Sequence, residues 1–311
     1  IEIIACNNCD TIVFHVKDER DITTKKSVNL RLRMMRSPVM RSGPRPLKVI
    51  SEIKEFNEDV SLTQVYTEPG IEGIPGSKHY CASAIILSVR GDDVKDKIIE
   101  IKDERIIELN INGASEYDIF LSSAATLDEG QDIVALALAS KEKVFKKSFS
   151  SLLASQEKWW SEFWERSYIC LRSENGKAEY LERGWVGWMY SMACSSRSWF
   201  VPHWNVLLWR VKGDWEMSWS GPRMWGWNLQ SHYEGIPESN HPELMLPYIN
   251  SYWKGVENGR WHALNIRGSK GTYLSETQFW NGIRTYQNID EKILLELRDY
   301  LLNRKKWDEL S

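Results

Sequence analysis

The sequence lacks any apolar run long enough to cross a membrane. Its longest runs, residues 81–89 and 133–139, fall well short of the roughly 20 residues that a transmembrane helix needs. No excess of basic charge is present either, because the formal net charge is −3 at pH 7. The sequence also has no glycine-rich phosphate loop and no G-x-S-x-G motif. We therefore expect no membrane span and no nucleic-acid partner.

Cysteine is scarce and odd in number, so at least one thiol has no partner within the chain. The Cys6-Asn-Asn-Cys9 stretch has the spacing of a zinc knuckle, but no second Cys/His pair follows closely. The histidines are scattered without metal-ligand spacing. We expect ordinary thiols, no metal and no cofactor. The five cysteines are Cys6, Cys9, Cys81, Cys170 and Cys194.

Tryptophan is missing from the first 158 residues, whereas all sixteen lie between Trp159 and Trp307. The tryptophan-free part contains short runs typical of strands. Residues 28–34 alternate strictly between apolar and polar. Similar runs occur at 11–16, 82–89, 97–101, 105–111 and 117–124. At 311 residues the chain exceeds one ordinary domain, and we predict an antiparallel β-sandwich over 1–127.

From about residue 128 the pattern changes to that of helices. We predict a helical linker over 128–170, with one or two helices in 129–166, and a helical domain over 171–311. Within that domain, helices are expected at 178–198, 223–235, 240–256 and 288–310, and irregular structure at 257–287. In the first of these, Tyr180, Leu181, Trp185, Trp188 and Met189 would share one face, and Gly184 and Gly187 would allow close packing. Asn240 would be the N-cap of the third helix, which Pro247 would kink or break.

The stretch 199–243 holds seven tryptophans interleaved with hydrogen-bonding side chains. A sugar ring offers C–H faces to an indole and hydroxyl groups to amides and carboxylates, so this composition suits a carbohydrate cleft. The alternative is that the tryptophans form a helical core, as is common for a single Trp. The interleaved charges favour the cleft. The expected substrate-binding residues are Trp215, Glu216, Trp219, Trp225, Trp227 and Gln230.

The order of strands, linker and helical domain resembles bacterial glycoside hydrolases with a β-supersandwich and an (α/α)6 toroid. Three stretches carry the resemblance: 117–126, 157–171 and, most specifically, 227–248. Within that group the chain looks most like the α-L-fucosidase-like family, glycoside hydrolase family 95, and its relatives. The resemblance implies an extracellular or periplasmic glycosidase with an oligosaccharide or polysaccharide substrate. It leaves the oligomeric state open.

The chain departs from the pattern of that family at its water site. The fucosidase pattern Asn-x-Asn-Leu-Gln has its second Asn at Asn228, but Gly226 replaces the first. Pro222 and Met224 stand where an Asp and a His usually do. Fucose specificity therefore does not carry over. The family's general acid lies later in the toroid, and this chain, which starts without Met and ends in a helical run, is expected to be a fragment.

Hydrolysis of a glycosidic bond usually needs two carboxyl groups, one on each side of the bond. Our candidate catalytic residues are Asn228, Glu276 and Asp214. The alternatives are a solvated loop carboxylate for Asp214 and Glu216, and a helix-start carboxylate for Glu276.

The resulting hypothesis is a glycoside hydrolase acting on a plant or host glycan. A non-catalytic glycan-binding homologue is the first alternative, because of the missing water-site groups. A toroid polysaccharide lyase is the second, because Tyr273, His262, Arg260 and Arg267 lie close together in sequence.

Overall fold

The computed structural model separates the chain into two compact units, which are considered one at a time. The first comprises Ile1–Met40, Leu47–Glu68 and His79–Glu162, and the second Arg41–Pro46, Pro69–Lys78 and Phe163–Ser311. The residues that the structure describes are 1–20, 28–33, 39–40, 47–56, 59–68, 70, 75–91, 94, 96–101, 106–112, 114–202, 224–278, 292, 295–296, 299–300 and 303–309.

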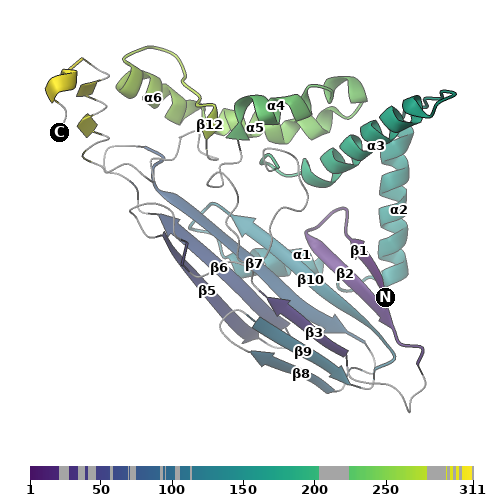
Figure 1. The fold of residues 1–311 in the computed structure, drawn as a ribbon. Helices are drawn as coiled ribbons and strands as arrows, with labels where there is room; N and C mark the ends of the chain where they lie inside the picture. The colour runs from purple at the N-terminus through teal and green to yellow at the C-terminus, as the bar shows by residue number, and fades with distance from the viewer. Residues whose placement is uncertain are drawn as a thin grey trace. The chain divides into compact units, whose positions relative to one another are not determined.

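Unit 1 is built on a large antiparallel sheet of seven strands (Figure 1). Its strand order is β1-β2-β10-β7-β6-β5-β4, and every neighbouring pair is antiparallel. The bounds are Glu2–Ala5 (β1), Thr11–Lys17 (β2), Val39–Met40 (β4), Leu47–Phe56 (β5), Asp59–Glu68 (β6), His79–Arg90 (β7) and Glu116–Thr126 (β10). The long strands β5 and β6 were not among those expected from the sequence.

A second sheet of three strands, in the order β3-β9-β8, shares a core with the first. Its strands are Val28–Arg33 (β3), Asp96–Ile101 (β8) and Ile106–Asn112 (β9). Ile107 and Leu109 of β9 are buried in one cluster with Leu62 of β6 and with Leu87 and Val89 of β7. Alternate residues of a strand point to opposite faces, so this cluster occupies one face of the large sheet.

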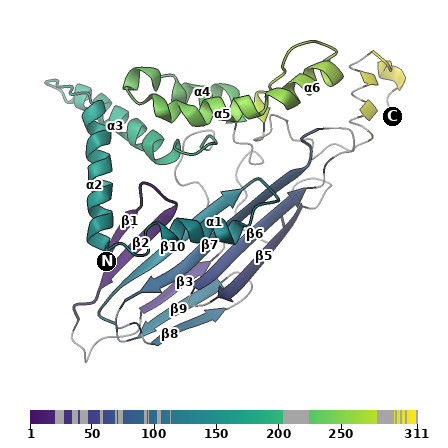
Figure 2. The same ribbon diagram turned by 180° about the vertical axis from the view of Figure 1, so that it is seen from behind.

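Helix α1 (Ile133–Glu142) covers the other face of the large sheet, as Figure 2 shows. Ile133 and Ala137 pack on Ala82, Ala84 and Ile86, the alternate residues of β7. The side chain of Asp132 caps the helix by accepting from the backbone N–H groups of its first turn. The strand-then-helix order predicted from the sequence is thus confirmed.

An ion pair is enclosed where α1 meets β6. Lys141 Nζ lies 2.5 Å from Asp59 Oδ2, and the two side chains are only 10% and 11% exposed. The ammonium group also lies 4.7 Å from the centroid of the Phe145 ring. Because neither charge reaches bulk water freely, each depends on the other for its solvation.

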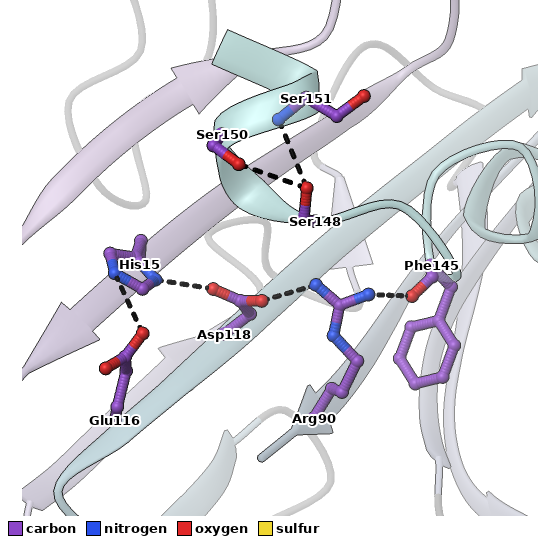
Figure 3. Close-up of polar contacts among 8 residues, drawn as sticks. All are labelled: His15, Arg90, Glu116, Asp118, Phe145, Ser148, Ser150 and Ser151. Carbon is purple, nitrogen blue, oxygen red and sulfur yellow. Dashed lines mark hydrogen bonds and ion pairs between the residues drawn. The ribbon is translucent and has the colours of Figure 1, made fainter.

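A polar chain crosses three strands of the large sheet (Figure 3). His15 Nδ1 of β2 lies 2.8 Å from Asp118 Oδ1 of β10, and Arg90 of β7 donates to the other carboxylate oxygen of Asp118. Arg90 also donates to the backbone oxygen of Phe145, just before α2 (Phe149–Arg166). The His15 ring stacks on Phe149, with 4.7 Å between ring centroids. These contacts fix the start of α2 on the sheet.

Unit 2 is helical in the part that the structure describes. Its helices are α3 (Lys177–Ser195), α4 (Gly226–Tyr233), α5 (Leu246–Lys254) and α6 (Val256–Arg267), with 3-10 turns at Pro237–Ser239, Pro242–Met245 and Trp307–Glu309. Two linker helices, α1 and α2, precede them, as expected. None of the described helices is long and apolar enough to cross a membrane. The toroid stays a prediction.

Several details of the helical prediction were wrong. In α3 the buried residues are Met189, Met192 and Ala193, whereas Tyr180 and Leu181 are exposed. The glycines of α3, Gly184 and Gly187, have no neighbour among the described residues within 4 Å of an added Cβ, so within the described part of the chain they serve no close packing. The stretch 257–287 is not irregular throughout, because α6 fills its beginning. Only parts of 288–310 are described.

The segment 240–256 is not one helix capped by Asn240. Asn240 adopts a left-handed conformation with φ of 59°, and its side chain donates to the Arg166 backbone oxygen at 2.9 Å. Arg166 in turn binds both carboxylate oxygens of Glu243, at 2.8 and 3.0 Å. The α-helix begins only at Leu246, and Pro247 occupies its first turn, where proline starts a helix instead of kinking it.

Candidate functional site

A short antiparallel ladder in unit 2 joins the segment just before Asn228 to the segment that carries Glu276. Strand β11 (Met224–Trp225) pairs with β12 (Thr277–Gln278), with Met224 opposite Gln278 and Trp225 opposite Thr277. The backbone N–H of Gly226 extends the pairing by donating to the Glu276 oxygen at 2.7 Å. Glu276 therefore lies against the first residue of α4, the helix that carries Asn228.

The glycine at position 226 leaves the Glu276 side chain close to the helix start. A Cβ built on Gly226 would lie 3.4 Å from Cγ of Glu276 and 3.7 Å from its backbone oxygen. These are ordinary contact distances, so a larger residue here would sit against Glu276. The resemblance places an asparagine at this position. In this chain glycine stands there, and the residue beside it, Glu276, is exposed.

Helix α4 separates its buried face from an exposed one. Leu229 and Tyr233 are buried, whereas Trp227 is 71% exposed and Gln230 is exposed. Asn228 is half-buried. An exposed tryptophan, a half-buried asparagine and the exposed Glu276 thus belong to the segments that are paired at the start of α4. This is the combination of a flat apolar face and hydrogen-bonding groups that binds a sugar ring.

The C-terminal end of α4 is anchored by Tyr233. Its hydroxyl lies 2.6 Å from Ser196 Oγ, which donates to the Leu244 backbone oxygen at 2.8 Å. Since Ser196 has one hydroxyl hydrogen, Tyr233 must be the donor in their contact. Burial raises the pKa of Tyr233 to about 12. Beside it, Trp188 Nε1 donates to the His232 backbone oxygen at 3.1 Å.

The segment that carries Glu276 is also fixed on α6. Gly259 allows this, because a Cβ there would lie 2.7 Å from Cγ2 of Thr272 and 2.9 Å from the Tyr273 backbone oxygen. The Tyr273 N–H donates to the Gly259 oxygen at 3.0 Å. Residues 272–278 therefore contact α6 at one end and pair with residues 224–226, at the start of α4, at the other.

A second polar cluster joins His262 and Arg267 of α6 to Tyr273, three residues before Glu276. Arg267 donates to the Tyr273 hydroxyl at 3.1 Å, and its guanidinium lies 4.7 Å from the centroid of the Tyr273 ring. The His262 ring meets the same tyrosine edge-on, with 5.1 Å between centroids. Burial and then the charge of Arg267 lower the pKa of His262. Arg260, also singled out from the sequence, instead pairs with Glu257 at 2.5 Å.

The remaining predicted site residues are outside the structural description. Asp214, Trp215, Glu216 and Trp219 lie outside the described residues, and only the backbone of Trp225 is described. The roles of Asp214 and Glu216 therefore rest on the sequence alone.

One residue near the site was missed by the sequence reasoning. Gln278 is only 1% exposed, and its amide atoms find no hydrogen-bond partner among the described residues. It lies two residues after Glu276 in the sequence, but Glu276 is exposed at a bend just before β12, so the two side chains differ in burial. No pattern in the sequence marks Gln278.

No cluster of three or more potential metal ligands occurs in the described part of the chain. The candidate site offers one carboxylate, amides, a phenol and a guanidinium. Such groups bind hydroxyls and carboxylates and can transfer protons.

The sequence matches no family model and no curated protein. Among solved structures, one titled "Putative kojibiose phosphorylase from human microbiome" is similar, with a TM-score of 0.49 and 12% sequence identity. The alignment covers 90% of this chain but 32% of that protein. This chain thus spans about a third of the length of that structure.

Proposed function

We propose that this chain forms part of a glycoside hydrolase that acts on a plant or host glycan. The observation that carries the proposal is the β11–β12 ladder, which places Glu276 against the start of α4, beside exposed Trp227 and half-buried Asn228. The sequence resemblance of 227–248 to the fucosidase-like family supports the same reading. On that reading, α3 to α6 belong to an (α/α)6 toroid, and the protein works outside the cytoplasm.

Each group has a distinct role in this proposal. Trp227 stacks on the apolar face of the sugar ring. The Asn228 amide holds a sugar hydroxyl or the attacking water, and the Glu276 carboxylate accepts a proton from that water or binds a hydroxyl. Glycoside hydrolysis also needs a second carboxyl group across the bond, and Asp214 is our candidate within this chain.

The test is turnover of a panel of aryl α- and β-glycosides, including fucosides, galactosides and arabinosides, by protein expressed from the complete gene. Replacing Glu276 by Gln removes a proton acceptor and should lower kcat by about 10²–10⁴-fold. Asn228→Ala should lower kcat/KM on the same substrate. Glu257→Gln is the matched control, because Glu257 is an exposed carboxylate of the same unit that pairs with Arg260.

The variants separate a hydrolase from a binding protein. Loss of turnover in Glu276→Gln, with Glu257→Gln unaffected and both folded, supports the proposal. Sugar binding without turnover by the unaltered protein would instead establish the non-catalytic glycan-binding alternative. Full activity of Glu276→Gln would remove Glu276 from the catalytic residues.

The Tyr273–Arg267–His262 cluster favours a second candidate, a polysaccharide lyase. A lyase needs a base for the proton next to a uronate carboxylate and a cation to bind that carboxylate. Tyr273 and Arg267 supply both kinds of group 3.1 Å apart. Incubation with uronate-containing polysaccharides tests this, because a lyase leaves an unsaturated sugar and a hydrolase does not. Absence of that product with every uronate polymer would dismiss the candidate.

A further inference from the structure

Two cysteines face each other in the turn between β1 and β2. Asn7 and Asn8 form the turn between Cys6 and Cys9. The Cys6 N–H donates to the Thr11 oxygen, and the Thr11 N–H donates to the Cys9 oxygen, each at 2.9 Å. A β-turn holds its first and fourth Cα atoms within about 7 Å, and a disulfide spans about 4.4–6.8 Å between Cα atoms. The backbone is therefore compatible with a bond between these two sulfurs.

The turn is fixed on both sides within unit 1. Asn7 Nδ2 donates to the Ser155 oxygen of α2 at 3.2 Å. The Ser123 N–H of β10 donates to the Asp10 oxygen at 2.7 Å. Both cysteines are half-buried and pack against the core cluster that contains Phe120 and Phe149. These hydrogen bonds and this packing therefore fix the turn and keep the two cysteines next to each other.

The surroundings make one thiol of the pair more reactive than the other. A hydrogen bond from Cys6 lowers the pKa of Cys9 to about 6, with further lowering by Thr11 and by the charge of Lys143. The same contact with Cys9, together with burial, raises the pKa of Cys6. A lowered thiol pKa favours the nucleophilic thiolate, so this shift favours Cys9 for attack, and leaves Cys6 to resolve.

We propose that Cys6 and Cys9 form a reversible dithiol–disulfide site that reacts with low-molecular-weight disulfides. The Cys9 thiolate attacks one sulfur of oxidised glutathione, forms a mixed disulfide and expels one glutathione thiolate. Cys6 then attacks the Cys9 sulfur, passes its proton to solvent and expels the second glutathione thiolate, which takes up a proton. Two protein thiols are oxidised and one glutathione disulfide is reduced to two thiols.

The experiment follows oxidation of the fully reduced 311-residue chain by oxidised glutathione at about pH 6. Remaining thiols are alkylated, and peptide mass spectrometry locates the products. Cys6 and Cys9 should be lost from alkylation together, with the loss of two hydrogens from their peptide. At this pH the reaction should run about tenfold faster than in the same chain unfolded in urea, whose thiols have ordinary pKa values.

Two variants establish the roles. Cys6→Ser should stop at a stable Cys9–glutathione mixed disulfide, whereas Cys9→Ser should leave Cys6 largely unmodified over the same time. Cys194→Ser is the control and should not change the formation of the Cys6–Cys9 bond. The proposal is overturned if folded and unfolded chains react at equal rates, or if Cys9→Ser leaves Cys6 as reactive as in the unaltered protein.

Discussion

Alkaline pH should destabilise unit 2 through Tyr233. This tyrosine is 1% exposed, and burial raises its pKa to about 12, whereas an unfolded tyrosine ionises near pH 10. Its stabilising contribution is complete below about pH 10 and is lost as the pH rises to about 12. The difference of about two units between the folded and unfolded pKa of Tyr233 corresponds to about 2.7 kcal/mol of folding free energy in total. At about pH 11 the loss should be about 1.4 kcal/mol.

The assay is urea unfolding followed by tryptophan fluorescence at about pH 8 and at about pH 11. Fluorescence reports mainly on unit 2, because all sixteen tryptophans lie between residues 159 and 307. Tyr233→Phe should cost about 1 kcal/mol at about pH 8, since it removes one hydrogen bond. It should also show a smaller further loss at about pH 11 than the unaltered protein.

Other tyrosines require controls in this experiment. Burial also raises the pKa of Tyr252, which adds alkaline sensitivity of the same sign. Tyr252→Phe and the double variant separate the two contributions, and exposed Tyr168→Phe should behave like the unaltered protein. If Tyr233→Phe and the unaltered protein lose equal stability between the two pH values, the assignment of Tyr233 as a buried anchor is refuted.

Three further predictions concern packing. Lys141→Met should lower the free energy of unfolding by about 3–5 kcal/mol, because it leaves the Asp59 carboxylate buried and unpaired. The double variant with Asp59→Leu should recover most of that loss. Urea unfolding followed by circular dichroism measures both. Gly259→Ala should cost about 1–3 kcal/mol by the same measurement, since the new Cβ would press on Thr272. Gly184→Ala is its matched control within a helix and should instead raise the free energy of unfolding by about 0.5–1 kcal/mol, because no described residue lies within 4 Å of the added Cβ.

The sequence predicted those strands in which alternation or a short apolar run stood between turn residues. The run 82–89 falls inside β7, and 117–124 inside β10. Strands β5 and β6 were missed because LKVISEIKEF and DVSLTQVYTE mix charged and apolar residues along their length. Their pairing with each other and with β7 determines them more than local pattern does.

The candidate site was predicted only as a set of residue types. Asn228 and Glu276 were chosen separately, and nothing in their spacing showed that a two-residue ladder joins the segments beside them. Helix α6 was missed because the glycines of 257–287, at positions 259, 268, 271 and 282, were taken to indicate irregular structure. The structure shows that Gly259 is required by the approach of Thr272, so a tertiary contact outweighed local propensity. The face predicted for α3 was right at Met189, which is buried, but Tyr180 and Leu181 at the start of the helix are exposed.

The β11–β12 ladder also has a kinetic meaning. It joins positions about fifty residues apart, and closing a loop of that length costs about 3.5 kcal/mol of chain entropy. Two residue pairs cannot supply this alone, so the ladder should form only after α4, α5 and α6 have shortened the loop between its ends. Glu276 would then reach Gly226 at a late step of folding, and destabilising α6 should abolish the proposed sugar binding before it unfolds the rest of the unit.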